Sequence, residues 1–142
     1  MKLNEIMSQT VLKIHPQESV AVAARMLANH NIGALPVCRE DGTLCGMVTD
    51  RDLVTRCVAS NRSPEKTMVQ DVMTGRLITA TPTMDVSVAA YLMGREQVRR
   101  LPVVENGKIC GIVSIGDIAG REESSYEAAE ALEGICSNLS QK

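Results

Sequence analysis

The first half of the chain alternates short apolar runs with a stretch of helical periodicity. Apolar runs at 11–14, 35–38 and 44–48 predict strands, the last two joined by a Glu-Asp-Gly turn. Between the first two runs, apolar residues at i, i+3, i+4 and i+7 predict a helix over 20–30, which Ser19 can cap. A further helix is predicted from about 50 to 60. The predicted order is therefore strand, helix, strand, strand, helix.

The second half has the same order of elements. Strands are predicted at 77–80, 100–104 and 109–113, with an Asn-Gly turn between the last two. A helix is predicted over 86–95, with Asp85 as its cap, and another over 115–120.

The two halves also repeat in sequence. Leu35-Pro36-Val37 returns 66 positions later as Leu101-Pro102-Val103, and Gly46-Met47-Val48 returns 65 positions later as Gly111-Ile112-Val113. A repeat of this length indicates one folded unit used twice. Two like units packed face to face would leave two like clefts.

The chain therefore divides into a first repeat, a linker, a second repeat and a tail. We assign residues 1–60 to repeat one, 61–66 to a polar linker and 67–120 to repeat two. Residues 121–142 form a tail, of which 122–136 have no mate in repeat one. The tail predicts an amphipathic helix over 122–136 with a stripe formed by Tyr126, Ala129, Leu132, Ile135 and Cys136. This helix could cap the core or contact a dimer mate or another partner.

Composition excludes several classes of protein. A formal net charge of −2, no Phe or Trp and two Tyr argue against a nucleic-acid binder. No apolar run approaches the roughly 20 residues that span a bilayer, and the N-terminus lacks a signal-peptide core. We expect a cytoplasmic protein without a membrane partner. The five cysteines lack C-x-x-C spacing, which argues against a disulfide framework or a zinc site, and we expect no metal ligands.

Candidate chemistry lies where each third strand runs into a helix. Thr49 and Asp52 stand there at i and i+3, and Ser114 and Asp117 repeat the arrangement. A hydroxyl there can donate to a phosphate, and a carboxylate one turn later can accept two hydrogen bonds from vicinal ribose hydroxyls. The same residue types are favoured helix caps. The motif alone leaves both interpretations open.

The duplicated unit resembles the cystathionine-β-synthase (CBS) domain. The resemblance rests on both Leu-Pro-Val runs, on Gly46 to Asp52 and on Gly111 to Asp117, and it covers residues 3–120. Two such domains in tandem resemble a Bateman module. The resemblance implies an α/β (α+β) fold of two β-α-β-β-α repeats with pseudo-two-fold symmetry, followed here by a C-terminal helix.

The resemblance also implies which residues bind a ligand. Asp52 and Asp117 would bind ribose hydroxyls, and Thr49 and Ser114 would contact ribose or phosphate. The adenine would lie in slots formed at Ile14, Ala34, Ala80, Thr81 and Arg100.

The two halves differ in charge at these positions. Repeat two has Arg99 and Arg100 where repeat one has Gly33 and Ala34, and repeat one has Arg51 where repeat two has Gly116. Guanidinium groups recognise phosphates in a bidentate manner, so Arg99 and Arg100 are candidate phosphate ligands. A solvated surface pair is the alternative. We expect two inequivalent clefts.

The function implied by the resemblance is regulatory and not enzymatic. Such modules bind AMP, ADP, ATP or S-adenosylmethionine between the repeats and transmit occupancy to a partner protein. We expect an energy-sensing homodimer with an unidentified protein partner, no required cofactor, and Mg²⁺ only if ATP is the ligand. Two alternatives remain: a structural dimerisation module with empty clefts, and a separate regulatory arm of an enzyme such as IMP dehydrogenase.

Overall fold

The chain packs as two compact units that do not follow the repeat boundaries. The computed structural model describes residues 1–121 and 124–137. One unit comprises Leu12–Leu77, and the other combines Met1–Val11 with the chain from Ile78 onward. We call them the Leu12 unit and the Ile78 unit. The start of repeat one therefore packs with repeat two, and the start of repeat two, up to Leu77, packs with repeat one.

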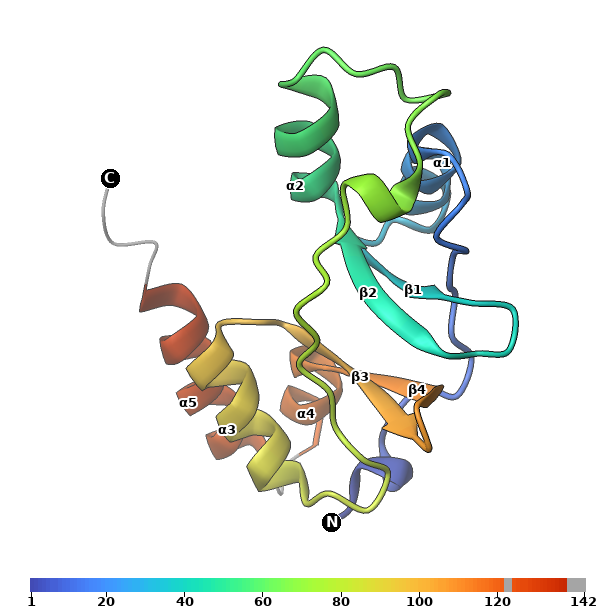
Figure 1. Cartoon of the computed structure of the whole chain (residues 1–142). Coiled ribbons are helices and arrows are strands. Elements are labelled where there is room, and N and C mark those ends of the chain that lie inside the picture. The colour runs from blue at the N-terminus through green and yellow to red at the C-terminus, as the bar shows by residue number, and fades with distance from the viewer. Residues whose placement is uncertain (122–123, 138–142) are drawn as a thin grey trace. The chain divides into compact units, whose positions relative to one another are not determined.

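The Leu12 unit is a hairpin flanked by helices (Figure 1). In chain order its elements are α1 (Val20–His30), β1 (Ala34–Cys38), β2 (Leu44–Thr49), α2 (Asp50–Leu53), the π-helical turn η2 (Val54–Val58) and the short 3₁₀ helix η3 (Val69–Asp71). Leu35, Val37 and Val48 are fully buried at its centre. The second predicted helix of repeat one thus exists, but it changes to π geometry after Leu53.

The Ile78 unit repeats this arrangement and adds a helix (Figure 1). Its elements are η1 (Leu3–Glu5), α3 (Val86–Glu96), β3 (Arg100–Glu105), β4 (Lys108–Ser114), α4 (Ile115–Ala119) and α5 (Ser125–Cys136). Leu101, Val103 and Val113 are fully buried in its core. The predicted mixed α/β class, with a small antiparallel hairpin in each half, is confirmed. No helix of the described residues is long and apolar enough to cross a bilayer.

The main helices begin at the predicted caps. The Ser19 side chain accepts a hydrogen bond from the Val22 amide at 3.2 Å, and Asp85 accepts one from the Ser87 amide at 2.9 Å. Each cap satisfies an amide that the first helical turn leaves without a partner. α1 ends at Asn31 in the left-handed conformation, where a short amide side chain is tolerated.

The predicted strands at 11–14 and 77–80 are wrong, because each segment forms only a single bridge. Ile14 bridges Val37 and Ala80 bridges Val103, both in parallel. The Cys38 amide donates to the Ile14 carbonyl at 2.9 Å. Two residues back along β1 stands Pro36, which has no N–H to donate. Pro102 interrupts the other pairing in the same way, so neither ladder can lengthen toward the start of its strand.

A second segment pairs with the far edge of each hairpin. Thr74 bridges Met47 of β2, and Ser8 bridges Ile112 of β4, both antiparallel. The two bridges use paired N–H to carbonyl bonds of 2.8 to 3.0 Å. Ser8 and Thr74 are repeat mates, so each repeat contributes its first segment to the unit that carries the other repeat's hairpin.

The tail helix α5 covers the core of the Ile78 unit through a face that matches the predicted stripe only in part. Of that stripe, Ile135 is buried and Leu132 packs against the core, but Tyr126, Ala129 and Cys136 are exposed. Ala128, Ala131 and Ile135 are buried, whereas Tyr126 is 70% exposed. A Cβ on Gly94 of α3 would lie 3.1 Å from Ala131 Cα. Helices that approach so closely can place only small side chains between them, which excludes Tyr126 from the contact.

Candidate functional site

In the Leu12 unit, Thr49 and Asp52 join the end of β2 to the start of α2. The Asp52 amide donates to Thr49 Oγ1 at 3.0 Å, and the Thr49 amide donates to Asp52 Oδ2 at 3.0 Å. This is a reciprocal capping box, which satisfies two amides at once. Asp52 is only 7% exposed.

In the Ile78 unit, Ser114 and Asp117 form the same box between β4 and α4. The Asp117 amide donates to Ser114 Oγ at 3.0 Å, and the Ser114 amide donates to Asp117 Oδ2 at 2.8 Å. Asp117 is half-buried. In both units the hydroxyl and one carboxylate oxygen accept hydrogen bonds from backbone amides. A ligand would therefore use mainly the other carboxylate oxygen.

The residues expected around the adenine lie on the strands next to each corner. Ala34 is directly opposite Thr49 in the hairpin register. Ile14, which is buried, lies on the other side of β1 and pairs with Val37. The Asp50 amide donates to the Gly33 carbonyl at 3.0 Å, which fixes the start of β1 against the start of α2.

The Ile78 unit repeats this geometry with basic residues in place of small ones. Arg100 is directly opposite Ser114, and the Ile115 amide donates to the Arg99 carbonyl at 2.8 Å. Ala80 is 1% exposed and pairs with Val103, three residues along β3 from Arg100, or about 10 Å. Thr81 follows it as an exposed residue.

Three arginines lie at the predicted ligand sites. Arg51 and Arg99 are exposed and Arg100 is half-buried. Among the described residues, none of the three guanidinium groups forms an ion pair. Repeat two therefore carries two cations beside Ser114 that no described carboxylate neutralises, where repeat one has Gly33 and Ala34.

Three cysteines lie on the strands: Cys45 and Cys110 are half-buried, and Cys38 is buried. Cys45 Sγ lies 3.2 Å from the Val37 carbonyl oxygen, and Cys110 Sγ lies 3.4 Å from that of Val103. Burial raises the pKa of both thiols, and of Cys38, above the ordinary value. Such thiols are poor nucleophiles. Within the described residues, no three His, Cys, Asp or Glu side chains lie together as a metal site would require.

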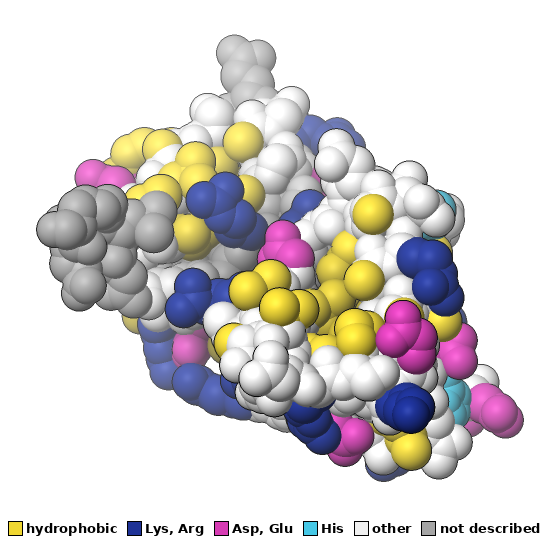
Figure 2. All heavy atoms as spheres, turned by 90° about the horizontal axis from the view of Figure 1, so that it is seen from above, with side chains coloured by type: hydrophobic (Ala, Val, Ile, Leu, Met, Phe, Trp, Pro, Cys, Tyr) yellow, Lys and Arg dark blue, Asp and Glu magenta, His cyan; other side chains and the backbone are white. Residues whose placement is uncertain are grey.

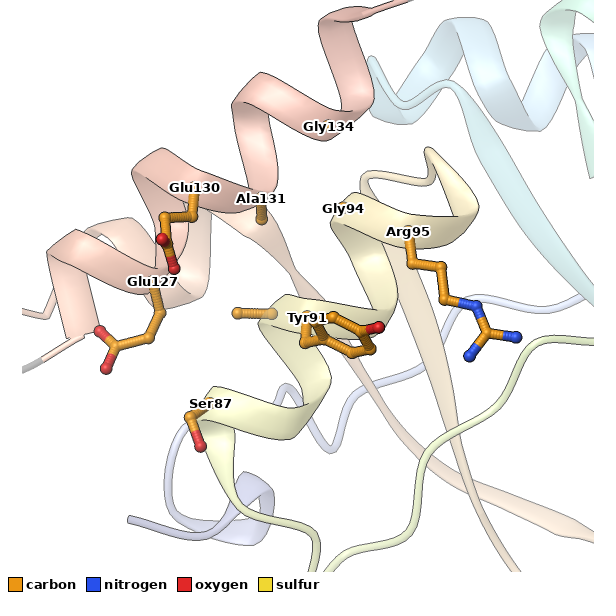
Figure 3. Close-up of a pocket in the computed structure, with 9 residues that line it drawn as sticks. Ser87, Tyr91, Gly94, Arg95, Glu127, Glu130, Ala131 and Gly134 are labelled. Atoms are coloured by element: carbon orange, nitrogen blue, oxygen red, sulfur yellow. The ribbon is translucent and has the colours of Figure 1, made fainter.

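Sequence reasoning missed a pocket between α3 and α5 of the Ile78 unit. Figure 3 shows Tyr91 and Arg95 projecting from α3, with Glu127 and Glu130 on the neighbouring α5. The pocket has a volume of about 340 Å³ and contains none of the predicted site residues. One Glu127 carboxylate oxygen is buried without a hydrogen-bond partner among the described residues. The small residues Gly94, Ala131 and Gly134 were the available signal for this close helix pair.

Comparison with known proteins establishes the family. A family model described as the CBS domain matches residues 3–59 and again residues 69–123. The chain belongs to the CBS domain family. The two matches make it a CBS pair, as the resemblance of both halves predicted.

Two relatives of this CBS pair are of similar length. The CBS domain-containing protein YhcV of Bacillus subtilis is 38% identical over 133 residues, covering 94% of each chain. Hypoxic response protein 1 of Mycobacterium tuberculosis is 30% identical over 135 residues, covering 95% of this chain and 94% of the relative.

Solved CBS structures share the fold. Hypoxic Response Protein I, solved with two coordinated zinc ions, superposes with a TM-score of 0.79 at 30% identity, covering 85% of this chain and 98% of that one. The CBS domain pair of protein MJ0100, solved with 5′-methylthioadenosine and S-adenosyl-L-methionine, gives a TM-score of 0.74 at 30% identity, covering 84% and 94%.

Proposed function

We propose that this CBS pair is a regulatory module that binds an adenine nucleotide or an adenosyl compound and transmits its occupancy to a partner protein. The proposal rests on the repeated junction between a strand and a helix. At each junction a hydroxyl and a carboxylate follow the end of the strand and lie next to apolar strand residues. The MJ0100 pair, which is 30% identical, was solved with two adenosyl ligands. This supports the choice of ligand class.

In this proposal, different residues of the Ile78 unit contact different parts of the ligand. Asp117 accepts hydrogen bonds from the ribose hydroxyls, and Ser114 contacts ribose or phosphate. Arg99 and Arg100 bind the phosphates, for which guanidinium groups beside Ser114 are suited. Ala80 and Thr81 border the adenine. Mg²⁺ would accompany ATP, because it bridges phosphate oxygens.

The Leu12 unit supplies the corresponding set with less positive charge. Asp52 and Thr49 take the roles of Asp117 and Ser114, and Ile14 and Ala34 border the base. Arg51 is its exposed cation at the corner. Because one repeat has two arginines at the strand start and the other has none, phosphate-rich ligands should prefer the Ile78 unit.

Transmission would occur by population shift and not by catalysis. A ligand that binds one conformation more tightly shifts the protein toward it by the difference in affinity. The regulated protein would be a separate chain that distinguishes these conformations. Burial raises the pKa of the Cys45 and Cys110 thiols, which makes them poor nucleophiles and is consistent with a non-catalytic role.

We propose a homodimer that uses the Leu12 unit. Val54 and Val58 of η2 are 58% and 62% exposed and lie one helical turn apart. The corresponding helix α4 is covered by α5, with Ser124 Oγ donating to the Ile118 carbonyl at 2.7 Å. Figure 2 shows hydrophobic side chains at the surface beside Lys and Arg. A second copy presenting the same two valines would bury them around a two-fold axis.

A structural dimerisation module with empty clefts is the second candidate. The capping boxes favour it, because each hydroxyl and one oxygen of each carboxylate already have backbone partners. A thermal-shift panel of AMP, ADP, ATP, S-adenosylmethionine and 5′-methylthioadenosine separates the two. A ligand at 100 times its Kd should add about 2.7 kcal/mol to the free energy of unfolding. Arg100→Ala and Asp117→Ala should then weaken the binding of that ligand, as measured by calorimetric titration. If no compound shifts the wild-type midpoint, the module is structural.

A further inference from the structure

The two equivalent aspartates have different surroundings. Asp52 Oδ2 accepts from the Thr49 amide, and Thr74 Oγ1 lies 3.4 Å from Asp52 Oδ1 and 3.5 Å from Oδ2. Arg56 Nη1 lies 3.9 Å from Asp52 Oδ1, and the Asp52 side chain is 10% exposed. Both carboxylate oxygens of Asp52 therefore have donors within its own unit.

Asp117 lacks the equivalent donors. Its Oδ2 accepts from the Ser114 amide at 2.8 Å, and no other described residue donates to its side chain. The repeat mate of Thr74 is Ser8, whose hydroxyl donates to the Thr10 carbonyl at 3.2 Å instead. The repeat mate of Arg56 is Arg121, which is exposed. The backbone bridges are alike, so the difference lies in these side chains.

Arg56 holds the segment that carries Thr74. Its Nη1 donates to the Val72 carbonyl at 3.1 Å and to the Met73 carbonyl at 3.0 Å. One guanidinium group thus ties residues 72–73 to η2 and faces Asp52 at the same time. Asp52, Thr74 and Arg56 all belong to the Leu12 unit, so they form one local network.

We infer that Thr74 and Arg56 form a latch on Asp52 that keeps the repeat-one site weak, so that ligand binds first through Asp117. This inference rests on the proposed function and adds its order of occupancy. A ribose diol reaches Asp117 without displacing a side-chain donor of the described residues. At Asp52 it must displace the Thr74 hydroxyl and move a segment fixed at 72–73. The Thr74 hydrogen bond to the Asp52 carboxylate is long, at 3.4 to 3.5 Å, and competition with it corresponds to about threefold to tenfold in affinity.

Thr74→Val removes the hydroxyl and keeps the branched shape, and Ser8→Ala is its matched control. Calorimetric titration with AMP, ATP and S-adenosylmethionine should show that Asp117→Asn weakens binding at least tenfold. Adding Thr74→Val to Asp117→Asn should recover about threefold to tenfold, through the repeat-one site. Adding Ser8→Ala to Asp117→Asn should recover nothing. If Thr74→Val/Asp117→Asn binds no better than Asp117→Asn, the latch is overturned.

A measurement without ligand separates this inference from the proposed function. Thr74→Val should lower the thermal midpoint in the wild type and have a smaller effect in an Asp52→Asn background. Ser8→Ala should have the same effect with or without Asp117→Asn. If none of the three ligands binds any variant but the effects of Thr74→Val and Asp52→Asn are coupled, the proposed function is contradicted and the contact between Thr74 and Asp52 is confirmed. If ligand binds but the coupling is absent, the latch alone fails.

Discussion

Gly46 of β2 lies so close to Met73 that a Cβ at position 46 would be 2.6 Å from Met73 Sδ and 2.9 Å from the Thr74 carbonyl oxygen. Its repeat mate Gly111 has the same relation to Met7, since a Cβ there would be 2.6 Å from Met7 Sδ and 3.0 Å from the Ser8 carbonyl oxygen. Both glycines are needed because a second backbone crosses the strand at this point, not because of an unusual backbone angle.

Gly46→Ala should therefore destabilise the Leu12 unit. The methionine can move, but the Thr74 carbonyl is fixed by its bridge to Met47, so we expect a loss of about 1–3 kcal/mol in the free energy of unfolding. Urea denaturation measures it. Gly75→Ala is the matched control, because a Cβ there meets nothing within 4 Å. Equal stability of the two variants would contradict the close approach.

Gly134→Ala should loosen α5 from α3. A Cβ at Gly134 would lie 2.5 Å from the Gly94 carbonyl oxygen, a backbone atom that cannot rotate away. The clash should outweigh the gain of about 1 kcal/mol in helix propensity. Hydrogen exchange of the α5 amides should accelerate. Ala129→Leu adds volume to the exposed face of the same helix and should leave that exchange unchanged.

Asp85→Ala should lower the free energy of unfolding by removing the cap of α3. Hydrogen bonds from the Ser87 amide and hydroxyl lower the pKa of the Asp85 carboxyl. A depressed folded-state pKa gives stability that is present above the unfolded value near 3.9 and is lost as pH falls through the folded value. The stability difference between wild type and variant should therefore shrink below about pH 4. A constant difference down to pH 2 would show that the carboxylate charge contributes nothing.

Alkaline pH should destabilise the fold through its strand cysteines. Burial raises the pKa of Cys38, Cys45 and Cys110 above the ordinary value of 9.0. A group whose folded pKa is raised contributes stability that is full below the unfolded pKa and is lost as pH rises through the folded one. The urea midpoint should therefore fall as the pH rises above about 8.5, the pKa of a cysteine in an unfolded chain. Replacing Cys38, Cys45 and Cys110 with Ala should flatten that decline.

Val58→Glu should dissociate the proposed homodimer. It places a charge on an exposed apolar position of η2, where burial against a second copy would be costly. Light scattering with size-exclusion chromatography reads the mass directly. Val88→Glu on α3, at a position 47% exposed, is the control and should remain dimeric. A monomeric wild type, or two dimeric variants, would rule out this interface.

The sequence was sufficient to predict the repeat, the helices and their caps, because these depend on local spacing and on single residues such as Ser19 and Asp85. It was also sufficient for the family. The strands at 11–14 and 77–80 were predicted wrongly because a strand depends on the segment that it pairs with. Pro36 and Pro102 could be read in the sequence, but the segments that lie opposite them in the sheet could not. The buried face of α5 was predicted only in part. Ile135 is buried as expected, but hydrophobicity favours Tyr126 where close packing against Gly94 selects Ala131.

The candidate site was predictable only as a set of repeated positions. The spacing of Thr49 and Asp52 gives both the capping box and the expected ligand contact, and spacing cannot distinguish them. The donors that reach Asp52 come from Arg56 and from Thr74, 22 residues away along the chain. Arg56 stands four residues after Asp52, a helical spacing that the sequence shows, but no local pattern links Thr74 to Asp52. The inequality of the two aspartates is therefore in part a property of the folded unit.

The crossing of Met1–Val11 into the unit built mainly from the second half has a consequence for how such a chain could have arisen. A polypeptide with one repeat alone would lack the edge segment that its own hairpin needs, since that segment comes from the opposite half. It could complete its sheet only by exchanging amino-terminal segments with another molecule. Gene duplication and fusion would then have turned that exchange between two molecules into an exchange within one.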